Sequence, residues 1–265
     1  MWQSRRLTDP TQIHNFLSRD RLWSAYALAD IVEPELAAQC EWYAAEQDEQ
    51  IHTLALVYRG FNPPVLLVMG EPEGLALLFG YTLRLPLVYL NAQAAHLPVV
   101  QSRYRSRKLD PMWRMVVQGA SFRPDKRAYL ATRLTPRYSQ ELARLYELGR
   151  EAGEEMVAFS PSQLHAGVFY GMVLEDGRLV AAAGTHVLSP FESLAAVGNV
   201  FTDPAHRRRG YASICTSAVT AHLLQQGIRD IVLNVNQANS GAVRIYERLG
   251  YASYCSFFEG IGERK

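Results

Sequence analysis

Apolar positions recur in short runs along the first half of the chain, separated by polar and proline-containing turns. Helical spacing dominates residues 11–50, where Thr11 is the expected cap of a first helix and Glu33-Pro34-Glu35 begins another. After residue 50 the runs become rich in β-formers, which predicts strands. The elements expected there are strands 51–58 and 65–69, a short helix 74–79, and strands 87–90 and 113–118.

The second half alternates strand and helix patterns more regularly. Residues 168–174 and 179–187 flank Asp176-Gly177, a turn pair that tolerates positive φ, and they predict a β-hairpin. The expected order is strand 129–134, helix 136–149 with Leu142, Leu145 and Leu148 on its apolar face, the hairpin, strand 194–201, a helix from Gly210 to Gly227, strand 231–235, a helix from Asn239 or Ser240 to Gly250, and strand 251–258. This order predicts an α/β chain of the mixed α+β kind, with helices flanking a mostly antiparallel sheet.

A polar, proline-containing stretch, Arg123-Pro124-Asp125-Lys126-Arg127, separates the two halves. A length of 265 residues also favours two domains. We therefore expect one domain over residues 1–125 and a second over residues 126–265.

The composition is that of an ordinary globular protein, and the formal net charge of +1 provides no overall field to attract nucleic acid or a membrane. Cys40, Cys215 and Cys255 lie far apart, which argues against a metal site or a disulfide framework and favours a reducing compartment. Residues 1–6 lack the apolar core of a signal peptide, and no run approaches about 18 apolar residues. We expect a cytoplasmic protein with no metal.

One basic run stands apart, at residues 101–108. Arg103, Arg105, Arg107 and Lys108 surround Tyr104 there. Such a run can contact nucleic acid or an acidic partner, but no nucleic-acid-binding module surrounds it, so a solvated helix face is the favoured interpretation.

Residues 198–213 carry the clearest chemical signal. An apolar strand turns at Asp203-Pro204, passes three arginines and Gly210, and enters a helix. The first N–H groups of a helix lack intrahelical partners and carry partial positive charge, so this arrangement predicts an anion site for phosphates. The alternative is a solvated arginine cluster on a loop.

Two motifs give residues 127–259 a resemblance to the GNAT superfamily of N-acetyltransferases. The first is the acyl-CoA pyrophosphate loop R-x-x-G-x-A, present as residues 207–212. The second is N-x-x-A-x-x-x-Y-x-x-x-G-Y, present as Asn239, Ala242, Tyr246, Gly250 and Tyr251. Within the superfamily the chain resembles the two-domain branch of glycine N-acyltransferase-like proteins. That implies a C-terminal GNAT acyltransferase fold preceded by a degenerate GNAT-like domain, without a pyrophosphate loop of its own, which forms the substrate-side wall.

The resemblance implies where acyl-CoA lies. The backbone of Val200, Phe201 and Thr202 would pair with the pantetheine arm, and the amides from Arg208 through Gly210, Tyr211, Ala212 and Ser213 would hold the pyrophosphate. The side chains of Arg207, Arg208 and Arg209 either reach phosphates or remain in solvent. Gly198-Asn199 is the expected bulge, where the strand separates from its neighbour and directs an N–H at the thioester carbonyl. Asn239 either contacts the cofactor or caps the following helix.

Tyr246 is the expected general acid, because a phenol can protonate the thiolate that leaves a thioester. The alternative for Tyr246 is a ring packed in the core. The general base stays unassigned among Glu192, His186 and His206, since Asn234 occupies a position where some family members carry glutamate.

The resulting hypothesis is an acyl-CoA-dependent N-acyltransferase that transfers acetyl from acetyl-CoA directly, in a ternary complex, to a primary amine of a small molecule or protein. The alternative is a catalytically silent acyl-CoA-binding sensor or regulatory protein. After residue 258 the usual last hairpin strand is missing from the pattern, so another segment or a partner chain is expected in that sheet position. Oligomeric state stays open.

Overall fold

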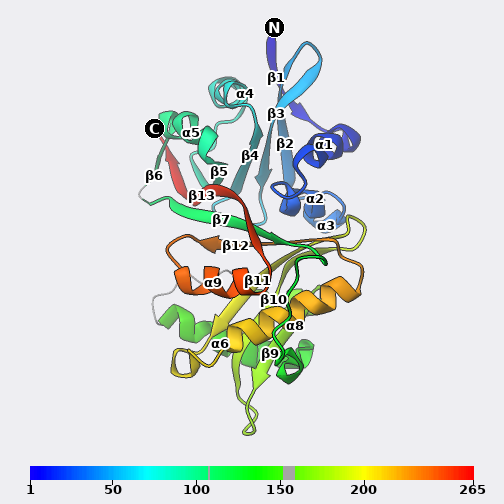
Figure 1. Cartoon of the computed structure of the whole chain (residues 1–265). Coiled ribbons are helices and arrows are strands. Elements are labelled where there is room, and N and C mark those ends of the chain that lie inside the picture. Colours follow the sequence, from blue (N-terminus) through cyan, green and yellow to red (C-terminus); the bar gives the residue numbers. More distant parts are fainter. Residues whose placement is uncertain (107, 152–158) are drawn as a thin grey trace. The chain divides into compact units, whose positions relative to one another are not determined.

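The computed structural model describes residues 1–106, 108–151 and 159–265 (Figure 1). The chain divides into two units. The first contains Met1–Arg114, Asn236–Ala238 and Ser253–Lys265, and the second contains Met115–Val235 and Asn239–Ala252. The expected domains 1–125 and 126–265 differ from these units at the first boundary, at Asn236–Ala238 and at the last thirteen residues.

The first unit is a sheet with helices packed against it. Its strands follow the order β1-β2-β3-β4-β5-β13, and all pairs are antiparallel except β4–β5. A short strand, β6, pairs with β13. Its elements are β1 (Trp2–Leu7), α1 (Pro10–Leu17), α2 (Ala25–Asp30), α3 (Pro34–Ala37), β2 (Cys40–Gln47), β3 (Gln50–Tyr58), β4 (Val65–Gly70), α4 (Pro72–Leu77), β5 (Leu87–Gln93), α5 (Leu97–Arg103), β6 (Tyr104–Ser106), the first residues of β7 (Asp110–Val117), and all but the first residue of β13 (Ala252–Arg264).

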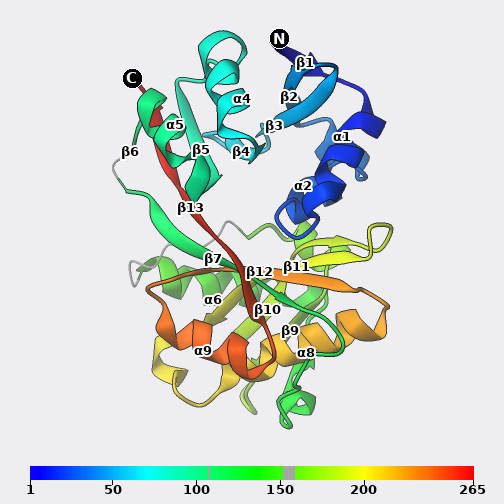
Figure 2. The same ribbon diagram turned by 45° about the horizontal axis from the view of Figure 1, so that its top comes forward.

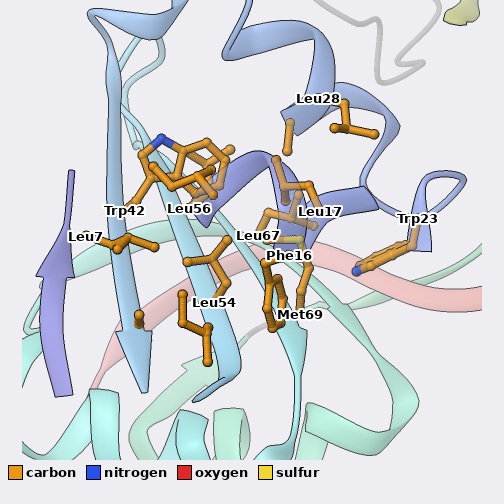
Figure 3. Close-up of a cluster of buried hydrophobic side chains, with 14 of the residues drawn as sticks. Leu7, Phe16, Leu17, Trp23, Leu28, Trp42, Leu54, Leu56, Leu67 and Met69 are labelled. Carbon is orange, nitrogen blue, oxygen red and sulfur yellow. The ribbon is translucent and has the colours of Figure 1, made fainter. Parts of the chain in front are cut away.

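Alternation along the strands gives the first unit two separate cores. On β3, Leu54 and Leu56 join the cluster that contains Leu17 and Trp23 from the α1–α2 region (Figure 3). The intervening Ala55 and Val57 join the cluster that contains residues of α4 and α5. Because successive strand side chains point to opposite faces, this pattern means that the sheet is covered on both sides.

The second unit repeats the strand topology of the first. β9, β10 and β11 are antiparallel neighbours and β11 is parallel to β12, as β2, β3 and β4 are antiparallel and β4 is parallel to β5. Helix α8 connects the parallel pair and packs against β9, β10 and β11, and α6 packs against β10 and β11 (Figures 1 and 2). Its elements are the end of β7, β8 (Thr132–Arg133), α6 (Ser139–Glu151), α7 (Ser162–Ala166), β9 (Phe169–Val173), β10 (Leu179–Ser189), β11 (Leu194–Thr202), α8 (Tyr211–Gln225), β12 (Asp230–Asn236) and α9 (Ser240–Arg248).

The mixed α/β fold and the order of elements in the second half are confirmed. Helical structure throughout residues 11–50 is wrong, because Cys40–Gln47 forms β2 between β1 and β3. The cap of α1 is Asp9, whose carboxylate accepts hydrogen bonds from the Thr11 and Gln12 amides, and not Thr11. In α6, Leu142 and Leu145 are buried as expected, but Leu148 is exposed and Tyr146 and Gly149 are buried in its place.

The C-terminal strand also differs from the prediction. β13 continues to Arg264, pairs with β5 and β6, and thus completes the sheet of the first unit. In the second unit, β7 is the neighbour of β12 in the strand order. Strand β7, an earlier segment of the same chain, therefore occupies the sheet position for which the sequence pattern predicted no strand.

The basic run is only partly helical. Arg103 ends α5 and is exposed, Tyr104 is buried in the core, and Arg105 lies exposed on β6. Lys108 pairs with Asp110 at 3.0 Å, and Arg107 lies outside the described residues. Within the described part of the chain, no helix is long and apolar enough to cross a membrane.

Candidate active site

The site begins where β11 and β12 separate. The two strands pair from Leu194–Asp230 to Val197–Leu233 and no further. β11 nevertheless continues to Thr202 and keeps pairing with β10 along its other edge. The edge of residues 198–202 that faces away from β10 therefore has no strand partner among the described residues, as a strand-like ligand requires.

A β-bulge marks the point of separation. Gly198 pairs with Gly184 and Phe201 pairs with Ala182, so two residues of β11 oppose one residue of β10. Asn199, in the bulge, has a φ of +51°. The bulge expected at Gly198-Asn199 is confirmed. The Asn199 N–H donates to His186, however, so it is not the N–H expected to meet the thioester carbonyl, and that part of the expectation stays a prediction.

Hydrogen bonds hold both main-chain groups of Asn199. Its carbonyl accepts from the hydroxyl of Tyr146 on α6 at 2.7 Å, and its N–H donates to Nε2 of His186 on β10 at 3.2 Å. The missing side chain of Gly198 makes room for this arrangement, because a Cβ there would overlap the His186 ring. Burial lowers the pKa of His186, which favours a neutral ring whose Nε2 is the acceptor.

The loop after β11 ends in a row of unpaired amides. Gly210, with a φ of +82°, is the N-cap of α8, and the first helical bond runs from the Ile214 N–H to the Gly210 carbonyl. No acceptor among the described residues bonds the N–H groups of residues 208–213. Tyr211, Ala212 and Ser213 form the first turn of α8, so these amides coincide with the positive end of the helix dipole.

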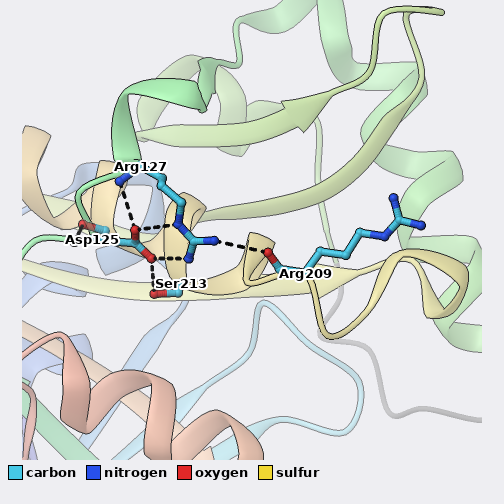
Figure 4. A network of polar contacts seen from close by, with 5 residues as sticks. Asp125, Arg127, Arg209 and Ser213 are labelled. Atoms are coloured by element: carbon cyan, nitrogen blue, oxygen red, sulfur yellow. Dashed lines mark hydrogen bonds and ion pairs between the residues drawn. The ribbon is translucent and has the colours of Figure 1, made fainter.

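The three arginines of the loop differ in their contacts. Arg207 donates from Nε to the Thr202 carbonyl at 3.2 Å and lies over the Phe201 ring. Arg208 and Arg209 are exposed, and the side chain of Arg209 extends away from the polar network in Figure 4. The guanidinium groups of Arg208 and Arg209 are therefore free to meet an anion or to remain in solvent.

Arg127, from outside the loop, also lies beside Gly210. From the sequence it was expected only to mark the domain boundary. Its guanidinium bonds Asp125 at 2.9 and 3.1 Å and approaches the Arg209 carbonyl at 3.5 Å (Figure 4). Asp125 in turn accepts from the Ser213 hydroxyl at 2.9 Å, and Arg127 holds the pKa of the Asp125 carboxyl down at about 2. The only sequence signal for this pair was the charged run itself.

Tyr246 is buried on α9 and is 7 % exposed. Its ring packs near that of Tyr251, whose hydroxyl bonds Thr220 of α8 at 2.8 Å. The Tyr246 hydroxyl has no hydrogen-bond partner among the described residues, and burial raises its pKa to about 12. The phenol is therefore protonated at neutral pH, as a general acid must be.

Asn239 caps α9, because its Oδ1 accepts from the Ala242 N–H at 3.1 Å. A cofactor contact by Asn239 stays a prediction.

Most of the residues considered as the general base bond other groups or lie away from the loop between β11 and α8. His206 pairs with Asp203 at 2.9 Å, and His186 uses Nε2 to accept the Asn199 N–H. Glu192 is buried in the turn before β11, at the opposite end of that strand from the phosphate loop. Asn234 lies one residue past the last β11–β12 pair, but an amide cannot take a proton at neutral pH.

The sequence of this region matches one known family. Residues 134–251 match the family model described as Acetyltransferase (GNAT) family. The matched residues make up less than half of the 265-residue chain. The match covers α6 to Tyr251 and includes β11, the loop between β11 and α8, and Tyr246.

Individual relatives match only part of the chain in sequence, and solved structures match all of it in fold. A mycothiol acetyltransferase of Actinosynnema mirum is 37% identical over 86 residues, which is 30% of this chain and 29% of the relative. The chain thus matches less than a third of that relative's length. A putative GNAT acetyltransferase from Novosphingobium aromaticivorans has a TM-score of 0.58 at 19% identity and covers 97% of this chain and 100% of its own. A tandem GNAT protein of clavulanic acid biosynthesis has a TM-score of 0.59 at 10% identity and covers 100% and 98%. At these identities the structures show the fold alone.

The first unit does not repeat the open strand edge that the second unit has at residues 198–202. Past the last β4–β5 pair, the Val68 carbonyl accepts from the Trp23 indole at 3.2 Å, and the Gly70 carbonyl accepts from His96 at 2.8 Å. The helix that follows, α4, has six residues, begins with Pro72 and carries Glu73 in its first turn. Proline removes one donor and glutamate opposes an anion, so the start of α4 is poorly suited to binding phosphate.

Proposed function

We propose that this chain is an acyl-CoA-dependent N-acyltransferase that moves acetyl from acetyl-CoA to a primary amine by direct transfer in a ternary complex. The observation that carries the proposal is the row of free amides at residues 208–213, directly after a strand that has separated from its neighbour. Helix N-termini with such amides bind phosphates, and an exposed strand edge accepts an extended amide chain. Pyrophosphate and pantetheine supply these two groups in one molecule.

In this proposal the main chain of Val200–Thr202 pairs with the pantetheine arm, and the amides through Ser213 hold the pyrophosphate. The amine nitrogen attacks the thioester carbonyl carbon, and the C–S bond breaks. Tyr246 gives its proton to the departing thiolate, and the proton of the attacking amine leaves through water. The acceptor, a small molecule or a protein, is left open.

The roles of the two halves are also proposals. We propose that residues 126–265 carry the reaction and that residues 1–125 are a degenerate copy that shapes the acceptor side. This division is supported by the repeated topology and by the side-chain hydrogen bonds to the Val68 and Gly70 carbonyls. The likeness to the glycine N-acyltransferase-like branch stays a prediction. The free thiols Cys40, Cys215 and Cys255 suit a reducing compartment, so we propose the cytoplasm.

A catalytically silent acyl-CoA sensor is the second candidate. The observation that favours it is that the two candidate histidine bases already bond other groups. His206 pairs with Asp203, and His186 accepts a backbone N–H. A sensor would share the cofactor site and lack amine-dependent turnover.

Two measurements on the full chain test these candidates. Calorimetry measures acetyl-CoA binding, and a thiol assay measures CoA release with a panel of small-molecule amines and lysine peptides. Binding with amine-dependent CoA release supports the transferase, with Tyr246→Phe as the control that should lose release and keep binding. Binding without release across the panel favours the sensor. The absence of binding refutes both.

A further inference from the structure

Asn199 carries a polar side chain that is buried without a hydrogen-bond partner among the described residues. The residue is 6 % exposed, and neither Oδ1 nor Nδ2 of its carboxamide has a hydrogen-bond partner among the described residues. A buried polar group without a partner is destabilising, and native structures contain few of them. Here two such atoms lie on one side chain.

Hydrogen bonds hold the main chain at Asn199 on both sides of the residue. Tyr146 and His186 bond the carbonyl and the N–H of Asn199 from two different elements, and the residue has a positive φ. Asparagine tolerates this conformation better than most residues. The main chain is therefore held in a strained bulge while the carboxamide stays unsatisfied, an arrangement that occurs at ligand sites.

The direction of the strand indicates which ligand end meets Asn199. Under the proposed function, on which this inference rests, phosphates lie at residues 208–213 and the pantetheine arm lies along residues 200–202. Asn199 precedes both and lies at the bulge, so it corresponds to the thioester end of the cofactor. That end offers a carbonyl acceptor, and the incoming amine offers an N–H donor, which complement Nδ2 and Oδ1 respectively.

We propose that the Asn199 carboxamide binds the reacting groups. Nδ2 donates to the carbonyl oxygen of the acyl thioester, and Oδ1 accepts from the amine acceptor. Tyr146 is a positioning residue that acts through the Asn199 main chain. The contact with the acyl group distinguishes acetyl-CoA from CoA, which has no thioester carbonyl.

Two variants test the contact without knowledge of the acceptor. Asn199→Gly keeps the positive φ, and Asn199→Asp keeps the side-chain shape but replaces the donor. Calorimetry with acetyl-CoA and with CoA should show acetyl-CoA affinity about tenfold lower in each variant, with CoA affinity changed less than about twofold. Thermal unfolding verifies that each variant folds, and if one does not, the other decides.

The remaining outcomes overturn the inference. Equal weakening of acetyl-CoA and CoA would place Asn199 on the shared arm, and unchanged affinities would make its role structural. If the wild type binds acetyl-CoA normally, either result refutes the Asn199 contact alone; if the wild type binds neither compound, the proposed function falls with it. Tyr146→Phe should also reduce the acetyl-CoA preference over CoA, by about threefold, which loss of packing alone would not do.

Discussion

Replacing Gly210 by alanine separates a backbone phosphate site from a simple patch of positive charge. Gly210 has a φ of +82°, and an added Cβ would lie 2.7 Å from Nη2 of Arg127. The left-handed conformation costs an L-residue about 1–2 kcal/mol. Displacing Arg127 from Asp125 adds less than about 1 kcal/mol, since half of the Arg127 side chain is exposed. Stability should therefore fall by about 1–3 kcal/mol.

Acetyl-CoA binding should weaken by a comparable free energy. If the backbone at residue 210 rotates to relieve the strain, at least one amide of the loop loses its alignment with the phosphates. A hydrogen bond to a charged group contributes about 1.5–3 kcal/mol, so acetyl-CoA affinity in Gly210→Ala should fall about ten- to a hundredfold. Arg208 is exposed, and Arg208→Gln should lower affinity by no more than about fivefold.

Gly177→Ala is the matched control. Gly177 lies in the β9–β10 turn with a φ of +84°, and its added Cβ would meet nothing within 4 Å. It should show a similar cost of about 1–2 kcal/mol in urea unfolding with unchanged acetyl-CoA affinity in calorimetry. The reasoning is refuted if Arg208→Gln weakens binding more than Gly210→Ala, or if Gly177→Ala weakens it equally.

Three further predictions concern the same unit. Tyr246→Phe should reduce turnover by about 10²–10⁴. Its acetyl-CoA affinity and melting temperature should stay unchanged, because the Tyr246 hydroxyl has no partner among the described residues. Tyr251→Phe should instead lose about 1 kcal/mol of stability and keep turnover, and the opposite pattern would exchange the two roles. The native pKa of Asp125, about 2, lies below its unfolded value, so the carboxylate stabilises the fold by about 1 kcal/mol above pH 4 and loses this effect as the pH falls from about 4 to 2. The free energy of urea unfolding of Asp125→Asn should therefore differ from wild type at pH 7 and converge with it near pH 2. A difference that stays constant with pH would contradict this. Gly198→Ala should displace the His186 ring and cost about 1–3 kcal/mol in urea unfolding, whereas an unchanged midpoint would show that the ring is not held there.

Local signals in the sequence predicted local features of the site. The glycine at the helix start, the asparagine cap of α9 and the bulge at Gly198-Asn199 are each encoded within a few residues. The order of strands and helices in the second unit followed from the same kind of short-range pattern.

Contacts between distant segments could not be predicted from the sequence. The bond from Tyr146 to Asn199 spans 53 residues, and the bond from Ser213 to Asp125 spans 88. No periodicity encodes such pairs, because either partner alone resembles an ordinary core tyrosine or a solvated aspartate. Strand β2 was missed for a related reason: burial between β1 and β3, and not its composition alone, determines its conformation.

The late position of β13 in the chain sets an order for folding during synthesis. Residues 257–263 pair with residues 87–93 of β5, and the Phe257 ring packs against Trp23 in the core of the first unit. At about 5–20 residues per second, roughly ten to thirty seconds pass between synthesis of β5 and synthesis of its partner. During that interval the residues of the second unit are synthesised, while β5 presents an open edge that can pair with other nascent chains. The first unit is therefore the last to acquire all of its strands, and its open β5 edge is an aggregation hazard until β13 pairs with it.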